Sequence, residues 1–425
     1  MTKYHCDLSG ETYYQFTTKA GYPVTVIYKP GHSKTYAMFG TNYGSMDTEC
    51  TPIDGSDTFA IPDGTAHFLE HKLFEGETED AFTRYSRTGA NANAFTSCDK
   101  TVYLFSCTER FEDSFGILLD FVTHPHFTKE NVDKEQGIIG QEIKMYEDDP
   151  DWRVLMNVMQ AMFHNNPARI DTAGTVETIA QITPEILYHC YDTFYNPNNM
   201  GIVVCGDVDP ICVQLLCERY LKERPAEAIM RKQISEPNQV KTKRISENRA
   251  VSNPQFLIGY KDPDGSIGLD AVKKELMSEI VLDMLLGTSS DFYGRLYEDG
   301  IINQDFSVGY YGGYGFGASL IGGEAKDPDR IFDEVGQAIR LAHENGLDAD
   351  SFKRAKNKIY GQRMRQLNSV ENTAMLFMDL NFLGVHFRDY IKAIDSITLQ
   401  ECENWLADHF TEDHRALSVI MPVSK

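Results

Sequence analysis

The feature that most constrains the fold of this chain is an internal repeat. A helical stretch over residues 182–195 leads to an apolar strand at 201–206. The same order recurs, at a constant shift and without a gap, in a helical stretch over 397–410 and a strand at 416–420. Such self-similarity indicates two halves of one ancestral fold, each of which ends in a helix followed by a strand.

The length of the chain agrees with this division. A chain of 425 residues is too long for one typical hydrophobic core, so we expect at least two domains. Residues 222–249 are polar and basic and include Pro225 and Pro237, which is typical of a linker. We therefore predict a first domain at 1–225, a linker at 226–249 and a second domain at 250–425.

Composition narrows the class of protein. The hydrophobic fraction of 42% is ordinary for a globular protein, and no apolar run approaches the length of a membrane span. The N-terminal residues lack an apolar signal core. The nine cysteines are odd in number and form no Cys-x-x-Cys pair, which favours reduced thiols over a disulfide scaffold. These features predict a cytoplasmic protein without a membrane anchor.

The net charge excludes one large class of partners. The formal charge is −23, whereas nucleic-acid binding depends on Lys and Arg side chains that neutralise phosphate. The charge is compatible with attraction of basic peptides, although a plain acidic cytosolic protein explains it equally well.

The stretch His67-Phe68-Leu69-Glu70-His71 carries the strongest chemical signal. In a helix, His67 and His71 lie one turn apart on one face, where both imidazoles can reach one Zn²⁺. Glu70 lies beside that face and suits a general base acting on water at the metal. The order His-x-x-Glu-His is the inverzincin motif. The alternative is a coincidence on an ordinary amphipathic helix.

Catalytic zinc usually has a third protein ligand, and a second predicted helix at 128–147 offers candidates. Thr128 is a plausible N-cap, and Glu135 and Glu142 are seven residues apart, hence on one face. One carboxylate could bind zinc while the other orients a ligand. Gly137 and Gly140 lie between them and suggest that another helix approaches closely there. The alternative is a solvated acidic face with two incidental glycines.

Together these motifs resemble peptidase family M16, the group of pitrilysin, insulysin and the mitochondrial processing peptidase. The family pairs His-x-x-Glu-His with Glu-x6-Glu about seventy residues downstream. Between them it has a Gly, then Asn-Ala-x-Thr, then Thr-x-Tyr, and this chain reads Gly89, residues 93–96 as Asn-Ala-Phe-Thr, and 101–103 as Thr-Val-Tyr. The resemblance spans essentially the whole chain and is nearest to the compact two-domain bacterial branch.

The resemblance implies a site, a cofactor and a fold. One Zn²⁺ per chain is expected. The implied roles are zinc ligation by His67, His71 and Glu142, base catalysis by Glu70, support by Glu135, and substrate binding by Asn93, Ala94 and Phe95. The implied fold is α+β, with two homologous α/β-sandwich halves of the LuxS and mitochondrial-processing-peptidase-like metallohydrolase type that close like a clamshell. The second half, which lacks the zinc motif, would form a wall of the chamber.

Three further segments have competing interpretations. Residues 101–107 are rich in β-formers, and they predict either an exposed edge strand that could pair with a peptide or a buried sheet strand. Residues 309–317 alternate Gly with Tyr and Phe but lack the Lys-Ser/Thr of a phosphate loop, so we expect a strand. His124-Pro125-His126 resembles a metal pair, but the proline prevents helical spacing, so a loop is expected.

The second half departs from the family pattern. Family members that act alone carry an Arg and a Tyr seven residues apart after a Gly-Arg-Leu-like turn, and this chain has Tyr297 and Phe306 in that region. Arg295 belongs to the preceding turn and is a poor substitute. Loss of such a donor would cost about 10²–10³-fold in rate. We therefore expect a dimer, either a heterodimer whose partner supplies the Arg/Tyr pair or a homodimer that uses other groups.

Two functions remain in view at this point. The first is a zinc endopeptidase that cleaves short unfolded peptides in an enclosed chamber. The second is a non-catalytic subunit that holds peptides or has a structural role. The intact ligand set and base favour the enzyme.

Overall fold

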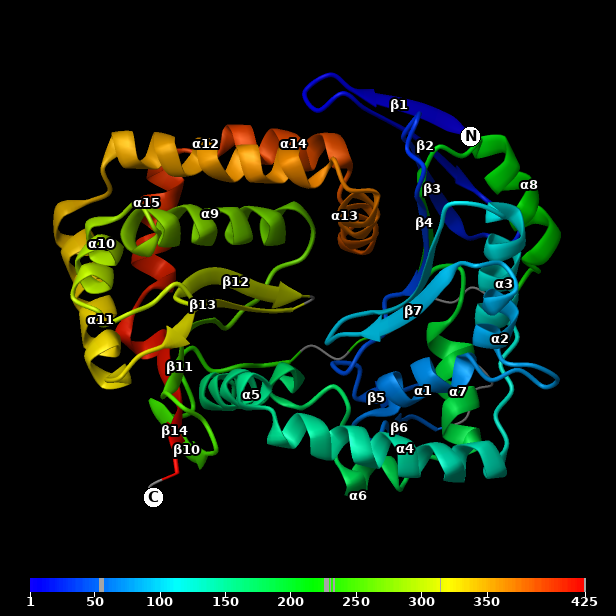
Figure 1. Cartoon of the computed structure of the whole chain (residues 1–425), viewed down its shortest axis with the longest axis horizontal. Helices are drawn as coiled ribbons and strands as arrows, with labels where there is room; N and C mark the ends of the chain where they lie inside the picture. The colour runs from blue at the N-terminus through cyan, green and yellow to red at the C-terminus, as the bar shows by residue number, and fades with distance from the viewer. Residues whose placement is uncertain (53–56, 225–228, 230, 232–233, 314, 424–425) are drawn as a thin grey trace. The chain divides into compact units, whose positions relative to one another are not determined.

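The chain folds into two compact units. The computed structural model describes residues 1–52, 57–224, 229, 231, 234–313 and 315–423. The first unit comprises Met1–Ile143, Asp171–Gln233 and Met364–Arg388, and the second comprises Lys144–Ile170, Ile234–Arg363 and Asp389–Lys425. Both units combine a mixed sheet with covering helices, which confirms the predicted α+β class (Figure 1).

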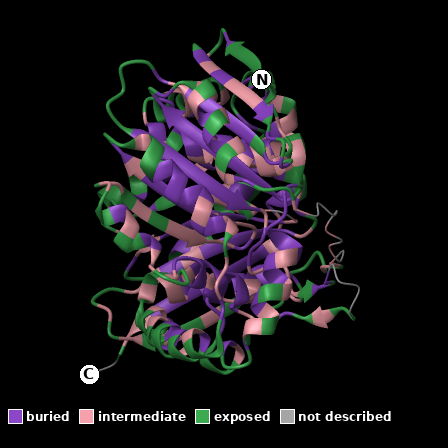
Figure 2. Cartoon of the chain, turned by 90° about the vertical axis from the view of Figure 1, so that its right-hand side faces the viewer, coloured by how far each residue is buried: buried purple, intermediate pink, exposed green. Residues whose placement is uncertain are grey.

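The first unit is built on a seven-stranded sheet. Its strands, in spatial order, are β1 (Thr2–Cys6), β2 (Glu11–Thr17), β3 (Pro23–Tyr28), β9 (Met200–Gly206), β4 (Thr35–Thr41), β8 (Thr101–Cys107) and β7 (Asn91–Thr96). Only the β3–β9 pair among these neighbours is parallel. Strands β4 and β9 are buried along their whole length because helices cover both faces of the sheet (Figure 2). A separate pair joins β5 (Glu49–Cys50) to β6 (Phe59–Ala60).

The helices of the first unit come from distant parts of the sequence. They are α1 (Thr65–Leu73), α2 (Ala81–Ser86), α3 (Phe111–Thr123), most of α4 (Lys129–Asp148), α6 (Val176–Ile179), α7 (Pro184–Phe194), α8 (Pro210–Tyr220) and α13 (Val370–Leu383). Helix α13 packs against β9 and β4 on one face, whereas α3 and α8 lie on the other (Figure 1). The face of the N-terminal sheet is therefore completed by a helix from near the C-terminus.

The second unit repeats the core of this plan. Its five strands, in spatial order, are β10 (Arg244–Arg249), β14 (Arg415–Pro422), β11 (Gln255–Asp262), β13 (Phe316–Glu324) and β12 (Ser307–Gly313). The β10–β14 pair is parallel and the others are antiparallel, the same pattern as β3-β9-β4-β8-β7. The repeat predicted from the sequence thus corresponds to α7 with β9 in one unit and to α15 (Leu399–His409) with β14 in the other.

The helices of the second unit complete the symmetry. They are α5 (Pro150–Met162), η1 (Pro167–Arg169), α9 (Gly268–Leu286), α10 (Asp291–Glu298), α11 (Pro328–Asn345), most of α12 (Ala349–Gln366), most of α14 (Phe387–Ser396), α15 and η2 (Glu412–His414). Helix α5 packs against β14 and β11, as α13 packs against β9 and β4. Each half of the sequence therefore contributes one helix to the sheet of the other half.

This exchange makes the units discontinuous in sequence, unlike the predicted domains 1–225 and 250–425. Residues 144–170 belong to the second unit and 364–388 to the first. Within the predicted linker 226–249, residues 226–228, 230 and 232–233 lie outside the described part, but 244–249 form β10. That strand reads as polar because it is an edge strand whose alternate residues are exposed.

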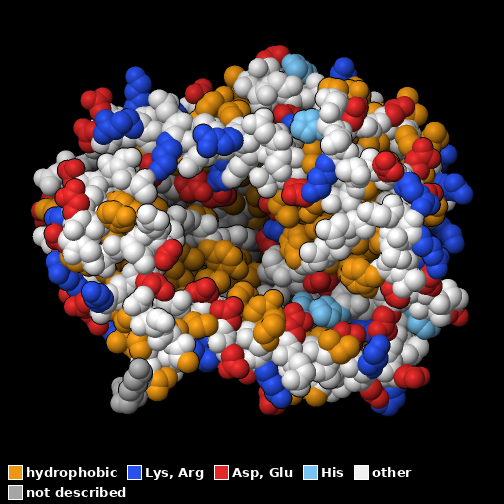
Figure 3. Space-filling model, in the orientation of Figure 1, with side chains coloured by type: hydrophobic (Ala, Val, Ile, Leu, Met, Phe, Trp, Pro, Cys, Tyr) orange, Lys and Arg blue, Asp and Glu red, His pale blue; other side chains and the backbone are white. Residues whose placement is uncertain are grey.

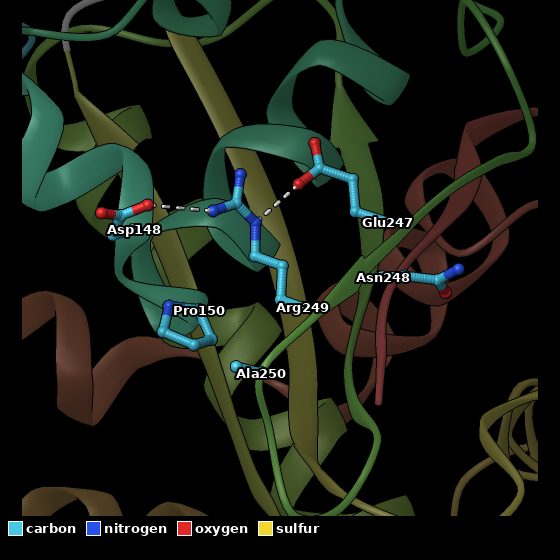
Figure 4. A pocket seen from close by; sticks show the side chains of 6 residues that line it. All are labelled: Asp148, Pro150, Glu247, Asn248, Arg249 and Ala250. Carbon is cyan, nitrogen blue, oxygen red and sulfur yellow. Dashed lines mark hydrogen bonds and ion pairs between the residues drawn. The ribbon is translucent and has the colours of Figure 1, made fainter. Parts of the chain in front are cut away.

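The end of β10 is tied to the turn between α4 and α5. The Arg249 Nε donates to Glu247 at 3.0 Å, and the guanidinium lies 3.9 Å from the Asp148 carboxylate (Figure 4). Pro150 and Ala250 line the same small pocket. Upstream, the Glu236 carboxylate accepts hydrogen bonds from the backbone amides of residues 164–166 and from Lys261. These contacts anchor both parts of the segment.

The three ambiguous segments are resolved by the structure. Residues 101–107 form β8, a strand buried between β4 and β7, so the edge strand of this sheet is β7 instead. Of the predicted strand segment 309–317, residues 309–313 lie in β12 and 316–317 in its antiparallel neighbour β13, and residue 314 lies outside the described part. The residues after α3 at 124–128 are irregular, as expected for a loop. All nine cysteines lie in the described part and are free thiols. Among the described helices, none has the length and hydropathy needed to cross a membrane.

Candidate metal centre

Helix α1 presents the His-x-x-Glu-His residues from a tightly packed start. Its N-cap is Gly64, whose φ of 93° is in the left-handed region. A β-carbon there would lie 2.4 Å from the carbonyl oxygen of Ala173, so only glycine fits. Phe68 and Leu69 are fully buried and orient the helix against the core. This packing turns His67 and His71 towards α4, whereas Glu70 contacts Thr96 of β7.

Helix α4 brings the carboxylates. The Thr128 hydroxyl accepts from the backbone amide of Asn131 at 3.2 Å, which confirms the predicted cap. Glu135 is buried and Glu142 is half-buried. The expected close approach of another helix at Gly137 and Gly140 is wrong, because a β-carbon at either position would have no atom of another described element within 4 Å.

The two helices bring His67, His71 and Glu142 together. One ligand atom from each of the three side chains lies within 4.8 Å of the others, and the described residues contain no other such group. The Nε2 atoms of His67 and His71 lie 3.7 and 3.6 Å from the Glu142 carboxylate oxygens. Ligands bound about 2.1 Å from one tetrahedral zinc ion lie about 3.4 Å apart, so this arrangement fits the metal. Histidine and acidic side chains gather at this place, over α1 and α4, in Figure 3.

The electrostatics of His67 also suit a metal ligand. Burial, with His71 nearby, lowers the pKa of His67 to about 3, so its ring is neutral at physiological pH. Neutral imidazole is the form that binds metals. Its Nδ1 is buried and, within the described residues, has no hydrogen-bond partner.

A chain of contacts orients His71. Its Nδ1 lies 3.0 Å from Glu135 Oε1, and the second oxygen of Glu135 accepts from Lys72 Nζ at 3.2 Å. Burial alone would raise the pKa of Glu135, but the His71 hydrogen bond and the Lys72 charge lower it overall. Burial alone would lower the pKa of His71, but the hydrogen bond to Glu135 and the nearby carboxylates raise it. Glu135 thus contacts the His71 nitrogen that faces away from Glu142, as expected for a carboxylate that orients an imidazole.

Glu70 is held by the end of the edge strand. The Thr96 hydroxyl donates to Glu70 Oε2 at 2.5 Å. Burial raises the pKa of Glu70, and this outweighs the opposing effect of the Thr96 hydrogen bond. A carboxylate with a raised pKa is a better proton acceptor than an ordinary glutamate, which suits it to proton transfer.

The predicted substrate residues lie on β7, whose outer side faces no described strand. Asn93 is exposed, and its side chain accepts from the Ala94 amide at 2.9 Å. Phe95 is half-buried. Their position on a free sheet edge suits main-chain pairing with an extended peptide.

Two residues that position the candidate centre were not identified from the sequence. Lys72 on α1 is fully buried beside His71. The sequence did contain a signal for it, because residues 68, 69, 72 and 73 lie on one buried face of the helix and Lys72 is the one charged residue among them. Lys100, in the turn after β7, pairs with Asp379 of α13 at 3.1 Å. No local pattern could have predicted that contact, because the two residues are far apart in sequence.

The region of the missing Arg/Tyr pair lies in the second unit. Arg295 on α10 pairs with Glu334 at 2.8 Å. Tyr297 is exposed and stacks on Tyr293, with ring centroids 5.6 Å apart. Phe306 is buried and contacts the rings of Phe256 and Phe292, among others.

Comparison with known proteins agrees with this arrangement. The family model of insulinase, peptidase family M16, matches residues 60–176, and that of the peptidase M16 inactive domain matches 181–359. An uncharacterized zinc protease of Bacillus subtilis, YmfH, is 38% identical over 418 residues, which cover 97% of each chain. The solved structure of an M16-like peptidase from Alicyclobacillus acidocaldarius is 35% identical, with a TM-score of 0.93 over 97% of this chain and 99% of that one.

A more distant structure shows the fold alone. A protease from Helicobacter pylori is 16% identical, with a TM-score of 0.83 over 99% of this chain and 100% of that one. Two family models that together span most of both units, and a relative that matches along nearly the whole length, confirm the predicted resemblance. This chain belongs to peptidase family M16.

Proposed function

We propose that this chain is a zinc-dependent endopeptidase that cleaves short unfolded peptides. The observation that carries the proposal is the convergence of His67, His71 and Glu142 within 4.8 Å, with Glu70 adjacent in the motif. Family membership and relatives named as zinc proteases support it. The proposed ligands are these two histidines and Glu142, with one zinc ion per chain.

Bound zinc would supply Lewis acidity that polarises a peptide carbonyl and acidifies water. Glu70, fixed by its hydrogen bond from Thr96, is positioned to take a proton from the attacking water and return it to the leaving nitrogen. Glu135 holds the His71 ring through Nδ1 and leaves Nε2 free to bind a metal.

Strand β7 provides the proposed substrate platform. An extended peptide can pair with its free edge, with Asn93, Ala94 and Phe95 as the binding residues. Such pairing uses the peptide backbone, so it tolerates many sequences but requires an unfolded segment. We propose that the reaction takes place in an enclosed chamber, as the family resemblance implies, and in the bacterial cytoplasm, where free thiols persist.

Full activity is proposed to require a second M16-type chain. The region where family members carry an Arg and a Tyr holds an exposed Tyr297 and a buried Phe306, and Arg295 is engaged with Glu334. A heterodimer would bring the missing pair, whereas a homodimer would have to use other donors.

The test measures zinc content and cleavage of a quenched fluorogenic peptide library on the purified chain. Stoichiometric zinc with chelator-sensitive cleavage is expected for an enzyme, and full rates from the chain alone would contradict the need for a partner. His71→Ala is expected to lose zinc, and unchanged zinc content would remove His71 from the ligand set. A chain that binds no zinc would overturn the proposal.

The second candidate is a non-catalytic subunit that holds peptides. The match of residues 181–359 to the inactive-domain model and the absent Arg/Tyr pair favour it. Zinc binding and peptide binding without cleavage, even with cognate M16 chains added, would support this candidate against the enzyme.

A further inference from the structure

Lys72 is a buried cation that no catalytic step uses. Its side chain is 0% exposed, although it follows His71 directly on α1. Its Nζ lies 2.6 Å from a Glu75 oxygen and 3.2 Å from Glu135 Oε2. Taking an ammonium group out of water costs several kcal/mol unless good partners compensate it. The position of Lys72 therefore needs an explanation beyond packing.

The Glu135 carboxylate is shared between Lys72 and the metal centre. One oxygen contacts His71 Nδ1 at 3.0 Å and the other accepts from Lys72. Two contacts at the two oxygens fix the plane of the carboxylate. An ionised acceptor at Nδ1 favours the tautomer with the proton on that nitrogen, which leaves the Nε2 lone pair for a metal. Nε2 lies on the side of Glu142, at 3.6 Å.

Charge balance gives Lys72 a second role. The centre gathers the carboxylates of Glu70, Glu135 and Glu142, and among the described residues Lys72 is the one Lys or Arg that forms an ion pair with any of them. Without it, the inner oxygen of Glu135 would lose its partner in a buried place. The carboxylate would then be free to turn away from His71.

We propose that Lys72 is a positioning residue of the zinc centre, acting through Glu135 to hold His71 ready to bind the metal. The inference rests on the proposed zinc site. A purely structural role, in which Lys72 only joins α1 to α4, would affect stability without a specific link between Lys72, Glu135 and zinc affinity.

The experiment is a double-mutant cycle on zinc affinity, measured by competition with a chromophoric chelator. It compares the wild type, Lys72→Met, Glu135→Gln and the double variant. Each single change is expected to weaken zinc binding about 10–100-fold. The double variant is expected to bind no more weakly than Glu135→Gln, because Lys72 acts through Glu135. The matched control is Glu75→Gln, which removes the other partner of Lys72 and should leave affinity within about twofold.

The outcomes separate this inference from the proposed function. A wild type without zinc would overturn the proposed function itself. Wild-type zinc binding with unchanged affinity in Lys72→Met would overturn the inference alone, as would additive losses in the double variant. If Lys72→Met does not fold, Lys72→Gln takes its place in the cycle, because it removes the charge but keeps a hydrogen-bond donor: weakened zinc affinity supports the inference, and unchanged affinity contradicts it.

Discussion

The two units contain equivalent pairs of helices, but the charged side chains on these pairs are arranged differently. In chain order, α1 and α4 of the first unit correspond to α9 and α12 of the second, since each pair brackets the last two strands at one end of its sheet, β7–β8 or β12–β13. The first pair brings together two imidazoles and carboxylates. The second brings Arg363 of α12 within 2.6 and 2.8 Å of Glu275 and Glu279 of α9. The second unit neutralises its own acids, whereas the first leaves carboxylates that a metal cation would balance.

The largest expected effect breaks the chemistry of the first pair alone. Glu70→Gln removes the proton acceptor but keeps the shape of the side chain and its Thr96 contact, so zinc should be retained. Loss of a general base is expected to lower kcat about 10³-fold. Steady-state rates and zinc content measured on one preparation test this expectation.

The matched control makes the same change in the corresponding helix of the second unit. Glu279→Gln on α9 should leave kcat within about twofold, because it removes no group from the metal centre. Retained activity in Glu70→Gln would refute the assigned base.

The next largest effect is expected from removing the ion pairs between α9 and α12. Arg363→Met would leave Glu275 and Glu279 without their shared cation, and the side chain of Arg363 is only 17% exposed. Partial exposure of the acids limits the cost, so the free energy of unfolding should fall by about 2 kcal/mol with zinc affinity unchanged. Urea denaturation of the zinc-loaded protein measures it. Arg295→Met is the control, since its pair with Glu334 is more exposed and should cost under about 1 kcal/mol. Equal losses in the two variants would contradict the contrast between the sites.

The fold class and the roles of the candidate centre were predicted through the family resemblance, and that resemblance rests on local sequence signals. A period of four places His67 and His71 on one face, a period of seven does the same for Glu135 and Glu142, and both helices form where these patterns occur. The repeat likewise follows from short segments, each of which ends in α7 with β9 or α15 with β14.

Contacts between distant segments could not be predicted in this way. The packing of α5 on β14 and of α13 on β9 joins segments more than 150 residues apart, and an amphipathic helix does not indicate which sheet it will cover. The choice between the two interpretations of residues 101–107 could not be made from the sequence for a related reason. Strand β8 has strong β-formers, but whether a strand is interior depends on its neighbours, and β7 takes the edge.

The third prediction concerns the pH dependence of stability at the helix pair of the second unit. Burial raises the pKa of Glu279 to about 7. The positive charge of Arg363 opposes this shift, and the negative charge of Glu275 adds to it. The folded state therefore holds a proton that the unfolded chain releases near pH 4.5, so this group makes the wild type less stable as pH rises from about 4.5 to 7. Glu279→Gln lacks this loss. Its unfolding free energy relative to wild type should rise by about 2 kcal/mol between pH 5 and pH 8. A pH-independent difference in urea titrations would show that Glu279 stays ionised beside Arg363.

The smallest effect tests what the exchanged helix α13 does for the centre. Lys100 in the β7–β8 turn pairs with Asp379 of α13 and with Asp99, each at 3.1 Å. Thr96, which fixes Glu70, lies four residues before Lys100, so a looser turn should misplace the base. Asp379→Asn is expected to lower kcat/KM about tenfold with zinc content unchanged, because small displacements of positioned groups slow catalysis.

The control for this change lies on the same helix. Glu371 pairs with Lys34, and both side chains are 45% exposed. Glu371→Gln should leave kcat/KM unchanged and should lower the free energy of unfolding by less than about 1 kcal/mol. If both variants lowered the rate alike, α13 would act only as general support for the sheet. A loss confined to Asp379→Asn would mean that the second half of the sequence contributes to catalysis through the turn that follows β7, although it holds none of the proposed ligands.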